Sequence, residues 1–205
     1  SDSGGWVAHR RRCADAGAHG AFAFELLAGD AQQAVDHCLI AHRLVNCLDR
    51  PGLCDVDPDV ATDLSLVRLP IDAEDLLRVD GTRAAAGRAP TTDTILAAAR
   101  EAFAAVGKWT GRPCAPVVRR GPETAQYAIV TAGAASAKAR AAAQMLAADG
   151  ISCAVIELTL LSPTPVEELQ RAIGDAITVA VLDPYGASAG QIDLTTLVRA
   201  ALWEC

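Results

Sequence analysis

The alternation of apolar strand-like and helix-like segments between Tyr127 and Leu202 constrains the fold more than any other feature of this sequence. Apolar runs of strand length alternate with segments of helical periodicity, in the order Ala125–Thr131, Ser136–Ala148, Cys153–Leu161, Val166–Ile173, Ala176–Leu182 and Leu194–Leu202. Continuous apolar strands are buried on both faces, and helical connections favour parallel pairing. The pattern therefore predicts an α/β fold, a parallel sheet with helices on both faces and right-handed crossovers.

A second α/β segment is predicted nearer the N-terminus. The apolar run Ala21–Ala28 has strand length, and Asp30 is a suitable N-cap for a helix that begins at Ala31. Apolar residues recur along this helix at spacings of three and four, which predicts a packed face and an opposite polar face. The packed face comprises Ala34, Val35, Cys38, Leu39, His42 and Val45, and the polar face comprises Gln32, Gln33, Asp36 and Arg43.

The central part of the chain is less regular. Two prolines, a glycine and three aspartates between Asp49 and Pro58 favour an exposed loop. We expect a strand around Leu64–Leu69, a short helix at Ala73–Val79, a connector from Gly81 to Pro90 and an amphipathic helix at Asp93–Val106. These segments predict three regions, namely a partial α/β segment (1–80), a linker with a helix (81–122) and an α/β domain (123–205).

Composition and charge exclude several classes of protein. The hydrophobic content of 51% suffices for buried cores, and 25 acidic against 18 basic residues give a net charge of −7, which disfavours nucleic acid as a partner. No apolar stretch is long enough for a membrane span, and no signal peptide is recognisable, so we expect a soluble, cytoplasmic protein. The seven cysteines contain no C-x-x-C pair and are interpreted as mostly reduced, buried residues.

Two loops are the candidate ligand or interface sites, because they follow strands of the predicted parallel sheet at its carboxyl edge. The first contains Gly133 and Ser136, and the second contains Asp183 and Gly190. The first loop lacks the spacing of known phosphate-binding motifs, so a structural turn is preferred over a nucleotide site. Asp183 is interpreted as a cap for the following backbone amides, with ligand binding as the alternative.

The sequence offers no recognisable catalytic or metal-binding set. There is no G-x-S-x-G elbow, and all four histidines precede residue 43. His37 and His42 lie five residues apart, so a helix would direct them to different sides and a shared metal ion is disfavoured. We therefore expect no catalytic residues, no metal and no cofactor in this chain.

The order of several short motifs resembles the pyruvate:ferredoxin and related 2-oxoacid:ferredoxin oxidoreductases. Residues 31–42 resemble that family's "V-Q-E-A-x-D…A-H" helix, and Gly111-Arg112 with Gly121-Pro122-Glu123 resembles its "G-R…Y-G-A-P-D-A-E" region. Residues 160–166 resemble "L-Y-R-P-F-P-V", and Val181-Leu182-Asp183 resembles "V-L-D-R". The likeness covers residues 20 to 202 in the same order.

The resemblance implies the end of a thiamine-pyrimidine-binding domain followed by a transketolase C-terminal-like domain. It also implies an oligomeric assembly that decarboxylates a 2-oxoacid and transfers electrons to ferredoxin, with thiamine diphosphate, iron–sulfur clusters and coenzyme A bound by other domains or subunits. In this interpretation the chain is a non-catalytic portion or subunit.

Two departures from the family leave alternatives open. The family's "F-F-D-G-F-R-T-S-H-E" is compared with Asn46–Gly52, and the residues after Asp183 are Pro184–Ala187 instead of the family's arginine and glutamate. Such changes would remove contacts of a subunit interface, so a diverged scaffolding or protein-binding module is the second hypothesis. An independent small-molecule enzyme using the Gly133 and Asp183 loops is the third.

Overall fold

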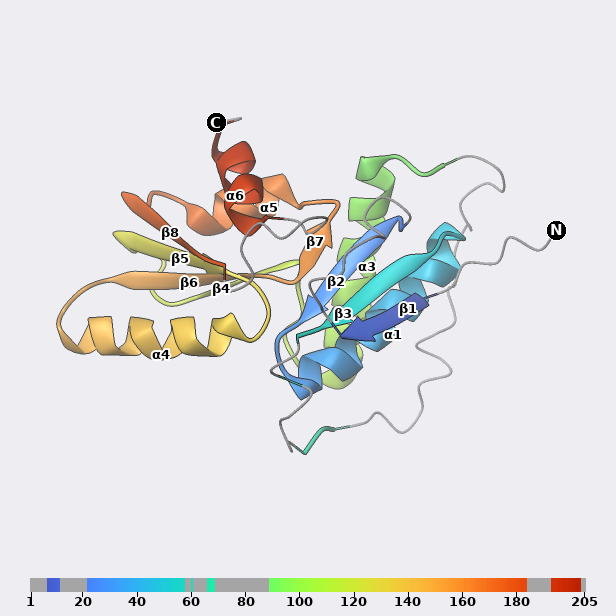
Figure 1. The fold of residues 1–205 in the computed structure, drawn as a ribbon, viewed down its shortest axis with the longest axis horizontal. Helices are drawn as coiled ribbons and strands as arrows, with labels where there is room; N and C mark the ends of the chain where they lie inside the picture. Colours follow the sequence, from blue (N-terminus) through green and yellow to red (C-terminus); the bar gives the residue numbers. More distant parts are fainter. Residues whose placement is uncertain are drawn as a thin grey trace.

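The computed structural model describes residues 7–11, 22–57, 60, 66–68, 89–183 and 193–203. They form two α/β units, each built on a four-stranded sheet (Figure 1). None of the helices in these ranges is long and apolar enough to span a bilayer.

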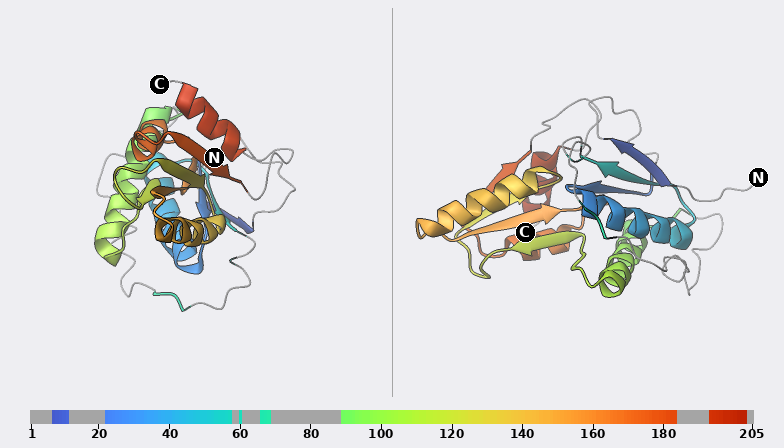
Figure 2. Two further views of the ribbon diagram at one scale, coloured as in Figure 1. Left: turned by 90° about the vertical axis from the view of Figure 1, so that its left-hand side faces the viewer. Right: turned by 90° about the horizontal axis from the view of Figure 1, so that it is seen from below.

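The first unit has the strand order β1-β3-β2-β7, in which β1, β3 and β2 are parallel and β7 is antiparallel. Helices α1 and α3 lie on one side of this sheet (Figure 2, right). Its elements are β1 (Val7–Arg11), β2 (Phe24–Ala28), α1 (Ala31–Leu48), β3 (Gly52–Val56), α3 (Thr92–Thr110) and β7 (Leu160–Ser162).

The second unit has the strand order β4-β6-β5-β8, with β6, β5 and β8 parallel and β4 antiparallel to β6. Helix α4 covers one face, and α5 and α6 cover the other (Figure 1). From β5 the chain moves one strand in one direction to β6 and then two strands back to β8, so crossovers of the same hand place their helices on opposite faces. Its elements are β4 (Val117–Arg120), β5 (Tyr127–Thr131), α4 (Ala135–Ala148), β6 (Cys153–Leu158), α5 (Val166–Ile173), β8 (Thr178–Leu182) and α6 (Leu194–Trp203).

Strands β2 and β7 separate the two hydrophobic cores. Leu26 of β2 and Leu160 of β7 belong to the core beneath α1 and α3, whereas Leu27 and Leu161, the next residue in each strand, belong to the core of the second unit. This division follows from strand geometry, because successive side chains point to opposite faces. All four leucines are at most 2% exposed, so the two units share a buried boundary.

The predicted fold class is confirmed, and so are the helices of the second unit. Helix α5 has the predicted bounds, α4 begins one residue before the predicted Ser136, and Gly150 follows α4 with a φ of 77°. Helix α1 begins as predicted, because the Asp30 carboxylate accepts a hydrogen bond from the Gln33 amide at 2.7 Å.

Several local predictions were wrong. The expected loop at Asp49–Pro58 contains strand β3, whose Asp55 is fully buried. Because carboxylates are uncommon in buried strands, the sequence pattern did not indicate a strand there. The predicted strand Cys153–Leu161 is divided at Thr159 into β6 and β7, which join different sheets. Strand β4 was missed because only two of its four residues are apolar.

The packed face of α1 is also different from the predicted one. Its buried residues are Asp36, His37, Ile40, Ala41, Leu44, Val45 and Leu48, whereas His42 is exposed and Cys38 is half-buried. The periodicity was read correctly as helical, but the buried side includes two polar residues that the prediction placed outside or ignored. The expected helix at Ala73–Val79, half of the expected strand Leu64–Leu69 and most of the connector Gly81–Pro90 lie outside the described residues, and residues 66–68 of the expected strand have no strand structure.

Candidate functional site

The strands that precede the two candidate loops end side by side, because β5 and β8 are adjacent parallel strands whose register pairs Thr131 with Leu182. Gly133 follows β5 with a φ of 65°, a conformation that strongly favours glycine. The loop is packed against the first unit: a Cβ placed on Gly133 would lie 2.5 Å from Asp57 Oδ2, and one on Gly29 would lie 2.3 Å from the Gly133 carbonyl oxygen. The Gly133 loop is therefore a contact between the two units.

A carboxylate of the first unit caps the helix that begins in this loop. Oδ2 of Asp57, which is fully buried after β3, accepts a hydrogen bond from the Ala134 amide at 2.8 Å. Negative charge at a helix N-terminus is favourable, and here α4 obtains it from a residue 77 positions away in the sequence. Ser136 is 2% exposed, and its hydroxyl has no hydrogen-bond partner among the described residues, so it does not present a nucleophile to solvent.

Asp183 has a similar role at the end of β8. Its Oδ2 accepts a hydrogen bond from the Leu194 amide at 3.1 Å, so this carboxylate binds the first turn of α6. Gly190, the fourth candidate residue, lies outside the described residues.

A polar network continues the contact between the units. Gln33 of α1 donates to Glu157 of β6 at 2.7 Å, and its amide oxygen accepts from the Gly29 backbone at 2.8 Å. Arg140 of α4 donates to the other oxygen of Glu157 at 3.3 Å. Glu157 is 2% exposed, so both of its oxygens are satisfied inside the boundary, as a buried carboxylate requires.

The strongest polar contact of the first unit joins α1 to the segment after α3. Arg112 donates from Nε to Asp36 Oδ2 at 2.9 Å and from Nη2 to Oδ1 at 2.5 Å, a two-point ion pair that fixes both side chains. Asp36 is 4% exposed. Its carboxylate raises the pKa of Arg112, so the guanidinium stays charged.

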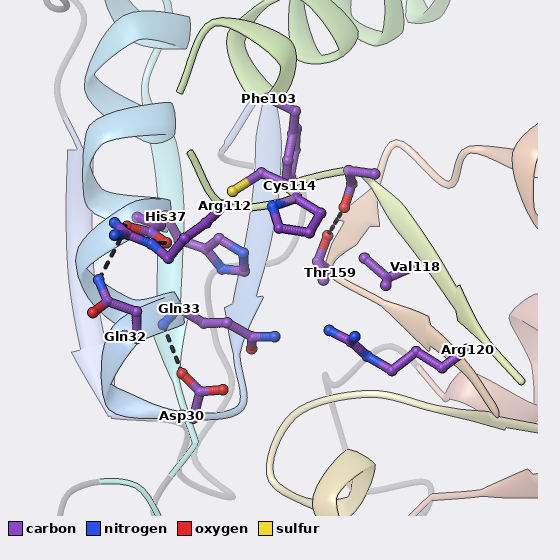
Figure 3. A pocket seen from close by; sticks show the side chains of 13 residues that line it. Asp30, Gln32, Gln33, His37, Phe103, Arg112, Cys114, Val118, Arg120 and Thr159 are labelled. Carbon is purple, nitrogen blue, oxygen red and sulfur yellow. Dashed lines mark hydrogen bonds and ion pairs between the residues drawn. The ribbon is translucent and has the colours of Figure 1, made fainter. Parts of the chain in front are cut away.

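A cavity of about 200 Å³ lies beside this ion pair, between α1 and β4 (Figure 3). Its polar lining includes Asp30, Gln33, His37 and Arg120, and its apolar wall includes Phe103, Pro113 and Val118. His37 packs against the Phe103 ring edge-on, with 6.0 Å between ring centroids. Both units contribute, since His37 belongs to α1 and Arg120 to β4.

His37 is the most perturbed titratable group of this cavity. Burial lowers its pKa from 6.5 to about 4, although nearby Asp36 and Asp30 act in the opposite direction. The imidazole is therefore neutral at neutral pH. Its Nδ1 is buried and has no hydrogen-bond partner among the described residues.

Two cysteines that the sequence did not associate are neighbours in the fold. Cys38 of α1 and Cys54 of β3 share a hydrogen bond, which lowers the pKa of the Cys38 thiol and, together with burial, raises that of Cys54. The partner of Cys38 could not be recognised from spacing, because it lies on a different element.

The residues that form these buried polar contacts were not identified from the sequence, although a signal for some of them was present. Asp36 lies in the first family-like motif and Arg112 in the second, so the ion pair connects two motifs that had been noted only for their order. Asp57, His37 and Arg120 had no such signal. Their roles depend on side chains that are distant in sequence.

Comparisons with known proteins agree with this architecture. Residues 125–202 match the family model described as pyruvate:ferredoxin oxidoreductase core domain II. Among solved structures, 2-oxoglutarate:ferredoxin oxidoreductase from Magnetococcus marinus is similar over 87% of this chain and 37% of its own chain, with 17% identity and a TM-score of 0.55. A split-gene transketolase, described as an inactive β4 tetramer, is similar over 88% of this chain and 44% of its own, with 18% identity and a TM-score of 0.50.

The chain thus spans less than half the length of each of the two chains that it resembles. At these identities the structural likeness establishes the fold. No curated protein matches the chain in sequence. The predicted resemblance is confirmed over residues 125–202, which match the pyruvate:ferredoxin oxidoreductase core domain II.

Proposed function

We propose that this chain is a non-catalytic part of a thiamine-dependent 2-oxoacid:ferredoxin oxidoreductase, and that it supports oxidative decarboxylation performed with partner domains or subunits. The observation that carries the proposal is the contact of Asp57 with the Ala134 amide. In open α/β sheets, ligands bind beyond the carboxyl ends of the strands. In this chain that position after β5 is filled by a carboxylate and by the backbone of Gly29.

Two observations support placing the family's cofactors outside this chain. A diphosphate at the start of α4 would meet the Asp57 carboxylate in place of free amides, and like charges repel. Within the described ranges, no three His, Cys, Asp or Glu side chains converge as ligands of a metal centre would. We therefore assign thiamine diphosphate, iron–sulfur clusters and coenzyme A to other parts of the assembly, and contact with ferredoxin is indirect.

The polar boundary between the units supports a positioning role. Gln33–Glu157 and Asp57–Ala134 connect the two units through buried contacts, and Asp36–Arg112 fixes α1 against the segment after α3 within the first unit. Such contacts fix one arrangement of the units, which is what a part that positions other domains requires. The chain is accordingly expected to act as one rigid component of an oligomer.

The test is purification of the native assembly through a tag on this chain. Intact mass should reveal partner subunits, and the complex should contain thiamine diphosphate and reduce ferredoxin in a reaction that depends on a 2-oxoacid and coenzyme A. Ser136→Ala should leave kcat and KM unchanged, because the hydroxyl is buried away from solvent. A loss of about a hundredfold in kcat would instead assign this loop to catalysis.

A stable complex without thiamine-dependent turnover would contradict the proposal and support the diverged scaffolding module instead. Recovery of the chain without any partner would contradict both interpretations.

A further inference from the structure

The charged groups that line the cavity between α1 and β4 are Asp30, Asp36, Arg112 and Arg120, and all of them except Arg120 have a side-chain hydrogen bond among the described residues. The Asp36 carboxylate is paired with Arg112 through two hydrogen bonds. Oδ1 of Asp30 accepts from the Gln33 amide at the start of α1, where the helix carries a partial positive charge. The guanidinium of Arg120 has no hydrogen bond or ion pair with the described residues, although it lines the same cavity.

Part of the cavity lining is apolar. Phe103, Pro113 and Val118 form a wall from three successive segments of the chain. The volume of about 200 Å³ is slightly larger than the apolar cavity of about 150 Å³ that holds benzene in an engineered protein. The space thus suits a compact apolar group.

His37 adds a hydrogen-bonding group without adding charge. The residue is 3% exposed and lines the cavity, and Nδ1 lacks a partner among the described residues. Figure 3 shows His37 and Arg120 on opposite sides of the cavity, one carried by α1 and the other by β4. Burial keeps the imidazole neutral at neutral pH, so it does not compete with Arg120 for an anion.

We propose that this cavity binds a small monocarboxylate with an apolar body. The carboxylate pairs with the Arg120 guanidinium, and the body contacts Phe103, Pro113 and Val118. A ligand in this position contacts both units, so it stabilises the folded chain by mass action. The inference does not depend on the proposed function, because it uses only this chain's own residues.

Calorimetric titration of the purified chain with benzoate tests the proposal. Benzoate should bind with one-to-one stoichiometry and a Kd of about a millimolar, as expected for a ligand of this size, and should raise the melting temperature. Benzyl alcohol, benzylamine and inorganic phosphate are the matched probes. Each lacks either the negative charge or the apolar ring, so each should bind at least about tenfold more weakly.

Arg120→Gln should weaken benzoate binding at least about tenfold, while the unfolding curve of the unliganded variant stays unchanged because Arg120 is exposed. The matched control is Arg199→Gln, an exposed arginine of α6 that is not part of the cavity lining, and it should bind benzoate as the parent does.

Three results would overturn the proposal. The first is the absence of saturable benzoate binding by the parent chain. The second is binding that persists unchanged in Arg120→Gln. The third is an equal affinity for any of the three matched probes, which would mean that the cavity does not select an apolar anion.

Discussion

Gly133 shows how one residue can belong to a contact between units. Its φ of 65° and the position of Asp57 Oδ2, 2.5 Å from where a Cβ would lie, make it doubly restricted. We expect Gly133→Ala to reduce the free energy of unfolding by at least about 2 kcal/mol, from backbone strain and loss of the Ala134 cap. Urea denaturation is the measurement. Gly150→Ala is the control, because Gly150 has a similar φ of 77° but open space around it, and it should cost only about 1 kcal/mol. Equal losses would contradict the packing argument.

His37 determines a pH dependence at the same scale. Its folded pKa of about 4 lies below the ordinary 6.5, because burial disfavours the charged form despite Asp36 and Asp30 nearby. The unfolded chain therefore binds this proton first, and stability falls as the pH decreases from 6.5 to about 4. The loss amounts to about 3 kcal/mol, at about 1.4 kcal/mol for each pKa unit.

Denaturation of His37→Leu across this pH range measures the effect. The variant should lose most of the slope between pH 6.5 and about 4, whereas His42→Leu, a change at an exposed site, should retain it. An unchanged slope in His37→Leu would assign the pH dependence to other groups.

At the scale of the elements, β7 couples two cores that are otherwise separate. Its Leu160 is fully buried against α1 and α3, although the strand continues from β6 of the other unit. Leu160→Ala should cost about 2 to 5 kcal/mol, as expected for a large-to-small change in a core. Leu182→Ala on the edge strand β8 is the control, and its cost should be smaller because that leucine is 39% exposed. Similar costs for the two variants would contradict the role of β7.

The elements themselves were largely predictable from the sequence. The second unit's helices follow local periodicity and end signals, such as Gly150 after α4 and the prolines before α5. Strand β3 was not predictable, because its Asp55 and the nearby Asp49, Pro51 and Asp57 are residues typical of loops, and Asp55 is buried only through contacts made by the fold. The buried face of α1 was misassigned for the same reason, since Asp36 is tolerated inside only when Arg112 pairs with it.

The whole molecule depends on such long-range pairs. Arg112→Ala would leave the Asp36 carboxylate buried without its cation, and we expect a loss of about 2 to 3 kcal/mol, less than for a fully buried pair because the Arg112 side chain is 26% exposed. Urea unfolding followed by tryptophan fluorescence and by far-UV circular dichroism should show the same loss with both probes. Arg199→Ala is the control and should change stability by at most about 0.5 kcal/mol. If Arg112→Ala left the free energy of unfolding unchanged, the ion pair with Asp36 would not contribute to stability.

The sequence by itself determined the α/β class, the helices of the second unit and the family resemblance, because each depends on residues that are close in the chain. Only the tertiary structure decided that the Gly133 loop receives Asp57, that Arg112 pairs with Asp36 and that His37 and Arg120 line one cavity. These residues are brought together from distant segments: Ala134 and Asp57 are 77 positions apart, and Arg112 and Asp36 are 76 apart. Periodicity reports which side chains share a face of one element, but burial and pairing depend on what the other elements place against that face.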